Sequence, residues 1–301
     1  MLGQSKIIIP FFLWMFLTIT IYSCGKKETS KKSEVLFSVI EARNLGLAYL
    51  EENRLDEAEA QFIKMTENAP NDAMGHANLG LIYLRKSDFT KAEKAVQQAL
   101  RLNSEDSDIN LILAEVYDAI ERDEEAIEIL QKSLSISPGH LRSIYKIIDI
   151  YRKMAYARPE DRAVTAKREN YLLELVKLAP GNIPVRLQLI ESLLTHGETD
   201  SALAQMEVLI QQIPEPPKEA SRAIRETLKQ MQAGNNSMAS RFFKVVHNVL
   251  KVTPRYQSGL WSLKGPGGAI TGFPILDFSE NLEQQMDDQS PVLNTLRFTD
   301  V

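Results

Sequence analysis

The side chains that could carry out chemistry are few in this sequence, and they are widely separated. The 301 residues contain one cysteine and four histidines, and no histidine belongs to a recognised metal-binding motif. These histidines are His76, His140, His196 and His247. Paired carboxylates such as Glu124 and Glu125 fall on predicted helices, where charged residues are expected on the solvent-exposed face. Nucleophile-elbow, zinc-protease and calcium-loop motifs are absent from the sequence. We therefore expect no enzymatic activity, no metal site and no cofactor.

The composition is that of a folded chain and excludes several classes of protein. Hydrophobic residues make up 44% and charged residues 25%, which excludes wholesale disorder. The formal net charge is −5, and no basic stripe with interleaved aromatic residues is present. A single cysteine allows neither an internal disulfide nor a cysteine-built zinc site. We expect no nucleic-acid partner, and we expect an apolar core large enough to stabilise the fold without disulfide bonds.

The one cysteine, Cys24, follows an apolar run over residues 7–22 with Lys6 at its amino-terminal end. A charged start and an apolar centre are typical of a secretory signal, and the run is short for a membrane span of about 20 residues. Ile21-Tyr22-Ser23-Cys24 resembles the bacterial lipobox. That resemblance implies a lipoprotein signal peptide over residues 1–23 and a diacylglyceryl group on the Cys24 thiol. A polar tether would follow over residues 24–33.

An ordinary signal peptide and an uncleaved anchor helix are the two alternatives for this segment. All three readings place the rest of the chain outside the cytoplasm. We expect a lipid-anchored protein of the cell envelope that faces the periplasm or the cell exterior.

Residue types recur at an offset of 34 along the body of the chain. Small residues, tyrosines and core-sized residues each repeat in three copies: Gly46, Gly80 and Ala114; Tyr49, Tyr83 and Tyr117; Ala58, Ala92 and Ala126; Phe62, Val96 and Leu130. A small residue on one helix lets a second helix approach closely, and proline after the second helix ends it. The pattern resembles the tetratricopeptide (TPR) repeat. It implies an all-α fold, a solenoid of helical hairpins.

The register predicts about five repeats and a capping pair of helices. The array covers residues 34–214, with repeats near 39–72, 73–106, 107–140, 141–182 and 183–214. An insertion of eight residues falls around Ala157–Ala166, where Pro159 favours a loop or a broken helix. Residues 215–253 form the capping pair or a degenerate repeat, because each repeat buries its apolar face only against neighbours. Residues 254–301 read as an irregular linker tail containing Gly and Pro.

The end of the chain resembles a second family. The segments Gly272–Phe278 and Leu296–Val301 resemble the sequence motif at the start of the β-propeller in secreted FG-GAP and ASPIC/UnbV proteins, which are related to cartilage acidic protein. This resemblance implies that the chain is the amino-terminal accessory region of a larger secreted protein that binds a ligand or polysaccharide.

The concave face of the predicted solenoid is the candidate binding surface, because the first helices of TPR repeats line it. The candidate residues on that face are Arg43, Asn44, Leu47, Ala77, Asn78, Leu81, Leu111, Glu115, Tyr145 and Asp149. Asn44 and Asn78 share one register position, so their amides could pair with an extended peptide backbone. The alternative is that both asparagines cap or solvate their own helices. The predicted function is a membrane-anchored extracytoplasmic scaffold that binds an unknown protein or peptide.

Overall fold

The computed structural model describes residues 34–264, and every regular element in that range is a helix. The signal segment, Cys24, the tether and the propeller-like sequence motifs lie outside the described residues. After a helix over residues 34–51, the helices are α2 (Leu55–Asn68), α3 (Ala73–Arg85), α4 (Phe89–Leu102), α5 (Ser107–Ala119), α6 (Asp123–Ile136), α7 (Leu141–Ala157), α8 (Arg162–Leu178), α9 (Ile183–Thr195), α10 (Thr199–Gln212), α11 (Lys218–Gln232), α12 (Asn236–Leu250) and α13 (Pro254–Lys264). The predicted all-α solenoid is confirmed.

The helices pair into hairpins through the same local signals in successive repeats. The first repeat is helix 34–51 with α2, and the next four are α3–α4, α5–α6, α7–α8 and α9–α10. Asn53, Ser87 and Glu121 stand 34 residues apart in the turns of the first three hairpins, and each has a positive φ. Asp72 and Asp106 cap α3 and α5 by accepting hydrogen bonds from backbone N–H groups in the first turn. The repeat is therefore encoded in its turns and caps as well as in its core.

Glycine allows the two helices of a hairpin to come into contact. A Cβ atom at Gly80 would lie 2.3 Å from Cγ2 of Val96, and one at Gly46 would lie 2.7 Å from the Phe62 ring. Both distances are below van der Waals contact, so a side chain at either position would force Phe62 or Val96 out of its place. This is the close approach that the 34-residue register predicts.

The loop expected around Ala157–Ala166 is limited to a turn over residues 158–161, because most of the eight extra residues lengthen the two helices of the hairpin. The third-repeat helices α5 and α6 have 13 and 14 residues, whereas α7 and α8 have 17 each, a gain of four and three. The connecting turn grows from residues 120–122 to residues 158–161, which accounts for the eighth residue. Pro159 lies in this turn, where it interrupts neither helix.

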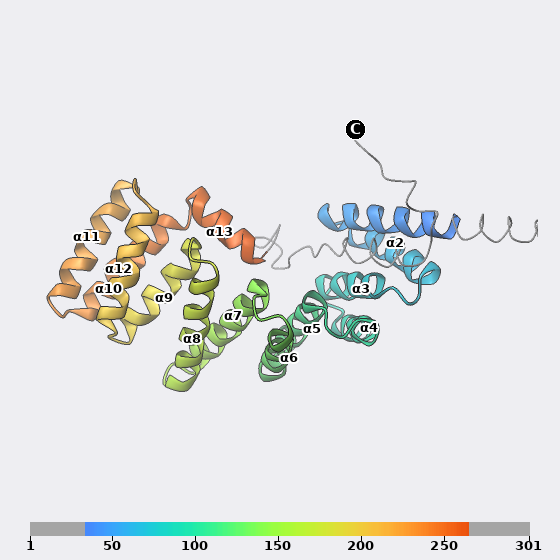
Figure 1. Cartoon of the computed structure of the whole chain (residues 1–301), viewed down its shortest axis with the longest axis horizontal. Helices are drawn as coiled ribbons and strands as arrows, with labels where there is room; N and C mark the ends of the chain where they lie inside the picture. Colours follow the sequence, from blue (N-terminus) through green and yellow to red (C-terminus); the bar gives the residue numbers. More distant parts are fainter. Residues whose placement is uncertain (1–33, 265–301) are drawn as a thin grey trace, which may run out of the picture.

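The apolar core consists of two clusters that follow one another along the solenoid. One cluster of buried side chains extends from Val39 to Val164 and a second from Ile144 to Leu263. Helix α7 belongs to both, with Ile147 in the first cluster and Ile144 in the second. Helices α4, α6 and α8 lie along one side of the solenoid and α13 on the opposite side (Figure 1). Between residues 34 and 264, no helix has the length and apolar character needed to cross a membrane.

The predicted linker after residue 253 begins with a helix. Helix α13 turns back from the end of α12 and packs against α9 and α7, on the face opposite the second helices (Figure 1). Its residues Tyr256 and Leu263 are buried in the second core cluster. An irregular segment is therefore wrong for residues 254–264, and the expectation for residues 265–301 lies outside the described residues.

Candidate functional site on the concave face

Four of the predicted binding residues come together in one place on the concave face. Leu111 and Glu115 on α5 and Tyr145 and Asp149 on α7 line a common cavity. Arg142, Lys146, Leu263 and Lys264 complete its wall. The cavity holds about 40 Å³, which accommodates water but no side chain. With α13 in place, this part of the concave face is therefore closed to a peptide.

An ion network crosses the floor of this cavity and joins α5 to α7. The Lys146 ammonium donates to Glu115 and, at 2.6 Å, to Asp118, and the Lys146 side chain is only 11% exposed. Burial opposes the charge of Lys146, but the two carboxylates outweigh it, and the pKa of Lys146 is raised. Lys153 also binds Asp118, and the two ammonium groups lower the pKa of that carboxyl against the effect of burial. Burial raises the pKa of Glu115.

A second polar cluster links the starts of the same two helices. Asp108 accepts a hydrogen bond from Arg142 at 3.0 Å and contacts Nε2 of His140 at 3.1 Å. Nδ1 of His140 lies 2.7 Å from the Ser143 hydroxyl. This histidine is held by protein groups on both ring nitrogens, so it has a structural role at the repeat junction.

Tyr145 is the most enclosed of the predicted binding residues on α7. Its ring is 8% exposed, and the Lys264 ammonium lies 5.5 Å from the ring centroid. Burial, with a contribution from the nearby Asp149 carboxylate, raises the pKa of Tyr145 to about 12. Tyr145 therefore contacts α13 within its own chain.

Helix α13 is attached to the concave face by contacts that the sequence analysis did not identify. The Asn182 amide donates to the Gly259 carbonyl at 2.8 Å and to the Ser262 hydroxyl at 3.4 Å. A Cβ atom at Gly259 would lie 2.9 Å from Cδ of Pro184, so glycine lets α13 rest directly on α9. The Tyr256 hydroxyl lies 3.3 Å from Nε2 of His247, whose Nδ1 contacts Glu191.

The six remaining candidates, from the first two repeats, divide between surface and core. Arg43, Asn44 and Leu47 are exposed or half-buried on the helix over residues 34–51. Ala77, Asn78 and Leu81 on α3 are buried, so their placement on an open binding surface is wrong.

The predicted pair of exposed asparagine amides is therefore also wrong. The Asn78 amide nitrogen donates to the Met74 carbonyl one turn earlier, and its carbonyl oxygen has no protein partner within the described range. The alternative reading, in which the asparagine serves its own helix, is correct at Asn78. Asn44 remains exposed.

Comparison with known families identifies the repeats. Residues 44–72 and residues 77–140 match tetratricopeptide-repeat family models. These segments are tetratricopeptide repeats, and the chain is a TPR solenoid of the kind suited to protein–protein interaction.

Individual relatives share the repeats and the fold. The chain is 29% identical over 149 residues to anaphase-promoting complex subunit CDC16 of Saccharomyces cerevisiae, which is 42% of this chain and 18% of the yeast protein. It resembles the solved structure of Pseudomonas aeruginosa pilF with a TM-score of 0.53 and 18% identity, over 75% of this chain and 97% of that one. A crystal structure of MamA is similar over 59% of this chain and 92% of its own, with a TM-score of 0.48 and 16% identity. The pilF likeness supports the fold alone.

Proposed function

We propose that the protein is an extracytoplasmic scaffold, anchored to a membrane by lipid on Cys24, that binds a partner protein along its concave face. The observation that carries the binding proposal is that a helix already lies on this face. Helix α13 rests on α7 and α9 through Leu263, a glycine contact and two hydrogen bonds from Asn182. A surface that accepts one helix in this way has the shape and chemistry to accept a partner's helix in its open part.

The open part of the concave face is the amino-terminal end. Arg43, Asn44 and Leu47 present a cation, an amide and an apolar group there. Mixed groups of this kind suit a partner that needs both an apolar contact and hydrogen bonds. The carboxy-terminal part is filled by α13, so a partner would bind first to the helix over residues 34–51.

Photocrosslinking tests which face binds the partner. Benzoylphenylalanine replaces Asn44 on the concave face or, as the control, exposed Lys94 on the outer face of α4. Irradiated cells expressing the full chain should yield a protein adduct from the Asn44 position and none from the Lys94 position. The reverse result would move the binding site to the outer face.

Anchoring is tested through the only thiol in the chain. Cys24→Ala should abolish incorporation of a radioactive fatty acid, because no other cysteine is present to be lipidated. Two or more acyl chains give stable membrane attachment, so the variant should also shift from the membrane to the soluble fraction. Equal labelling of the variant and the wild type would refute the lipid anchor.

The second candidate function rests on the propeller-like sequence motifs at Gly272–Phe278 and Leu296–Val301. In that case the solenoid is the accessory region of a larger secreted propeller protein that binds a ligand or polysaccharide. The coding sequence downstream of residue 301 decides it: about 100 further codons with acidic propeller loops favour this reading, and a stop codon refutes it.

A further inference from the structure

The first junctions between repeats are closed by a tyrosine on the outer side of the solenoid. Tyr117 of the third repeat donates to Glu93 on the preceding second helix at 3.0 Å. Tyr83 of the second repeat has Glu59 as its hydrogen-bond partner in the same way. The two pairs share one register, since Glu59 and Glu93 stand 34 residues apart, as do the two tyrosines.

Each of these tyrosines also lies beneath a cation of its own repeat. The Lys91 ammonium is 5.3 Å from the Tyr83 ring centroid, and the Arg122 guanidinium is 4.1 Å from that of Tyr117. The guanidinium of Arg122 also lies 3.6 Å from Glu93. A carboxylate, a tyrosine and a cation therefore lie together at each of these two junctions.

The junction between the third and fourth repeats keeps the tyrosine but lacks the carboxylate and the cation at these register positions. The register replaces Glu93 with Ile127 and Arg122 with Tyr156, whose side chain is 89% exposed. Tyr151, the counterpart of Tyr117, stacks instead on Tyr171 of α8, with ring centroids 6.1 Å apart. The lengthened α7 and α8 bring further apolar groups to this position, and the groove stays open.

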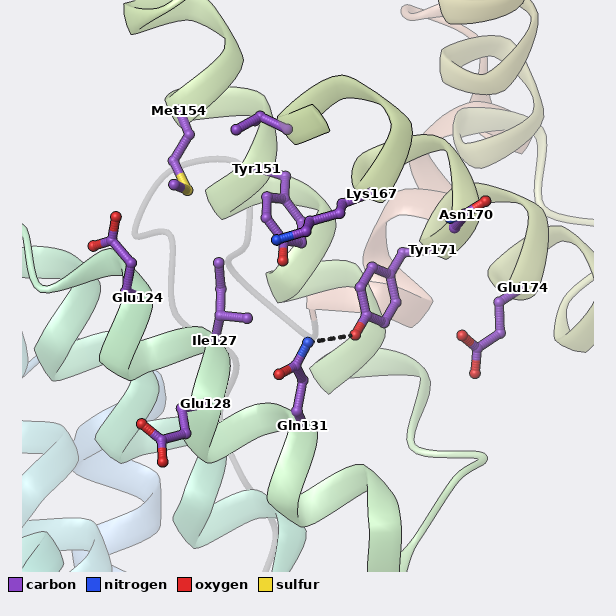
Figure 2. Close-up of a pocket in the computed structure, with 11 residues that line it drawn as sticks. Glu124, Ile127, Glu128, Gln131, Tyr151, Met154, Lys167, Asn170, Tyr171 and Glu174 are labelled. Carbon is purple, nitrogen blue, oxygen red and sulfur yellow. Dashed lines mark hydrogen bonds between the residues drawn. The ribbon is translucent and has the colours of Figure 1, made fainter. Parts of the chain in front are cut away.

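The open groove is a pocket of about 510 Å³ between α6 and the α7–α8 hairpin. Figure 2 shows its side chains converging from these three helices, with Gln131 of α6 donating to the Tyr171 hydroxyl at 3.0 Å. Ile127, Tyr151 and Val164 form a buried floor, and Met154 is half-buried beside them. The volume exceeds that of any single side chain, so an apolar group of a ligand fits.

The rim of this pocket is acidic. Glu124 and Glu128 of α6 and Glu174 of α8 are exposed and line the opening, together with one cation, Lys167. None of these carboxylates forms an ion pair with another residue of the range 34–264. At the preceding junctions the corresponding groove carboxylates are neutralised by Lys86 or Arg122. Here three negative charges face outward against one positive charge.

We propose that this outer pocket is a second binding site, for a basic segment of a partner protein in which an apolar side chain is flanked by lysine or arginine. The apolar side chain enters the pocket over Ile127 and Val164 and removes apolar surface from water on both partners. The flanking cations pair with the three rim carboxylates and supply the charge that Arg122 supplies one repeat earlier. The site is separate from the concave face, so one scaffold can hold two proteins.

A peptide of stated sequence serves as the probe. We expect acetyl-Lys-Lys-Leu-Lys-Lys-amide to shift the methyl NMR signals of Ile127, Met154 and Val164 in the full chain. The same peptide with glycine in place of leucine should bind about tenfold more weakly, since it lacks the apolar group. Equal binding of the two peptides would show that charge alone attracts them and would overturn the pocket.

Charge variants locate the site on the protein. Glu124→Gln, Glu128→Gln and Glu174→Gln together should weaken the leucine peptide about tenfold at low salt, because the rim loses its charges without losing its shape. The matched control makes the same charge change elsewhere, at exposed Glu67, Glu105 and Glu207. A loss of affinity in the control equal to that in the rim variant would refute the proposal, as would retained affinity in the rim variant. Unchanged urea midpoints verify that both variants fold.

Discussion

At the scale of the residue, Gly80 shows how one missing side chain sets the distance between two helices. A Cβ at this position would lie 2.3 Å from Val96, with the backbone of Ala92 at 3.4 Å behind it, so Gly80→Leu must separate α3 from α4. We expect a loss of about 1–3 kcal/mol or more in the free energy of unfolding. Gly139→Leu is the control, because no atom lies within 4 Å of a Cβ there. Equal urea midpoints for the two variants would contradict the packing.

Tyr145 makes the stability of the protein depend on pH in the alkaline range. Its pKa is about 12 in the folded protein, where burial disfavours the phenolate, and about 10 in an unfolded chain. Between these values the folded state keeps a proton that the unfolded state has lost, so stability falls as the pH rises above 10. The loss approaches about 1.4 kcal/mol per pH unit. Urea unfolding at pH 9 and pH 11 should therefore show a smaller decline in Tyr145→Phe than in Tyr156→Phe, whose ring is 89% exposed.

Much of the residue-scale structure is predictable from the 34-residue register, and the failures have physical causes. Gly46 and Gly80 are at helix crossings as predicted, because only a close approach requires glycine at that spacing. Asn78 could not be placed, since the same polar side chain suits an exposed groove or a buried hydrogen bond to its own helix. The outer pocket could have been noticed in the sequence, because one register position changes from glutamate, at Glu59 and Glu93, to isoleucine at Ile127.

At the scale of the element, α13 depends on contacts with residues more than 70 positions earlier. Asn182 and Pro184 fix it to α9, and no local pattern in residues 254–264 predicts that attachment. The lengthened α7 and α8 were missed for a different reason. Pro159 indicates a break in the helices, but it cannot show that the break lies in a four-residue turn.

The close contact of α13 with α9 predicts the effect of a larger residue at Gly259. Gly259→Val places a side chain where Cδ of Pro184 already stands 2.9 Å from the Cβ position, so α13 should detach. Hydrogen exchange of residues 254–264 should accelerate, and the pKa of Tyr145 should fall toward 10 as its cover is lost. Ser258→Val, at an exposed position of the same helix, is the control. Unchanged exchange in Gly259→Val would show that the contact does not hold α13.

At the scale of the whole molecule, a solenoid joins its repeats only through nearest neighbours, and α7 is the element shared by the two core clusters. Local damage should therefore spread only a short way along the chain. Gly80→Leu should accelerate hydrogen exchange in α2 to α5 and leave exchange in α9 to α12 unchanged. Met206→Ala, in the second cluster, should accelerate exchange in α9 to α12 and leave exchange in α2 to α5 unchanged.

Ile144→Ala with Ile147→Ala removes one fully buried side chain from each cluster, and both ends of the array should then exchange faster. Mass spectrometry of peptides from residues 34–264 measures all three variants. Uniform acceleration across that range in Gly80→Leu would mean that the array unfolds as one unit. α7 would then not mark an energetic boundary between two clusters, and the core would act as a single cooperative body.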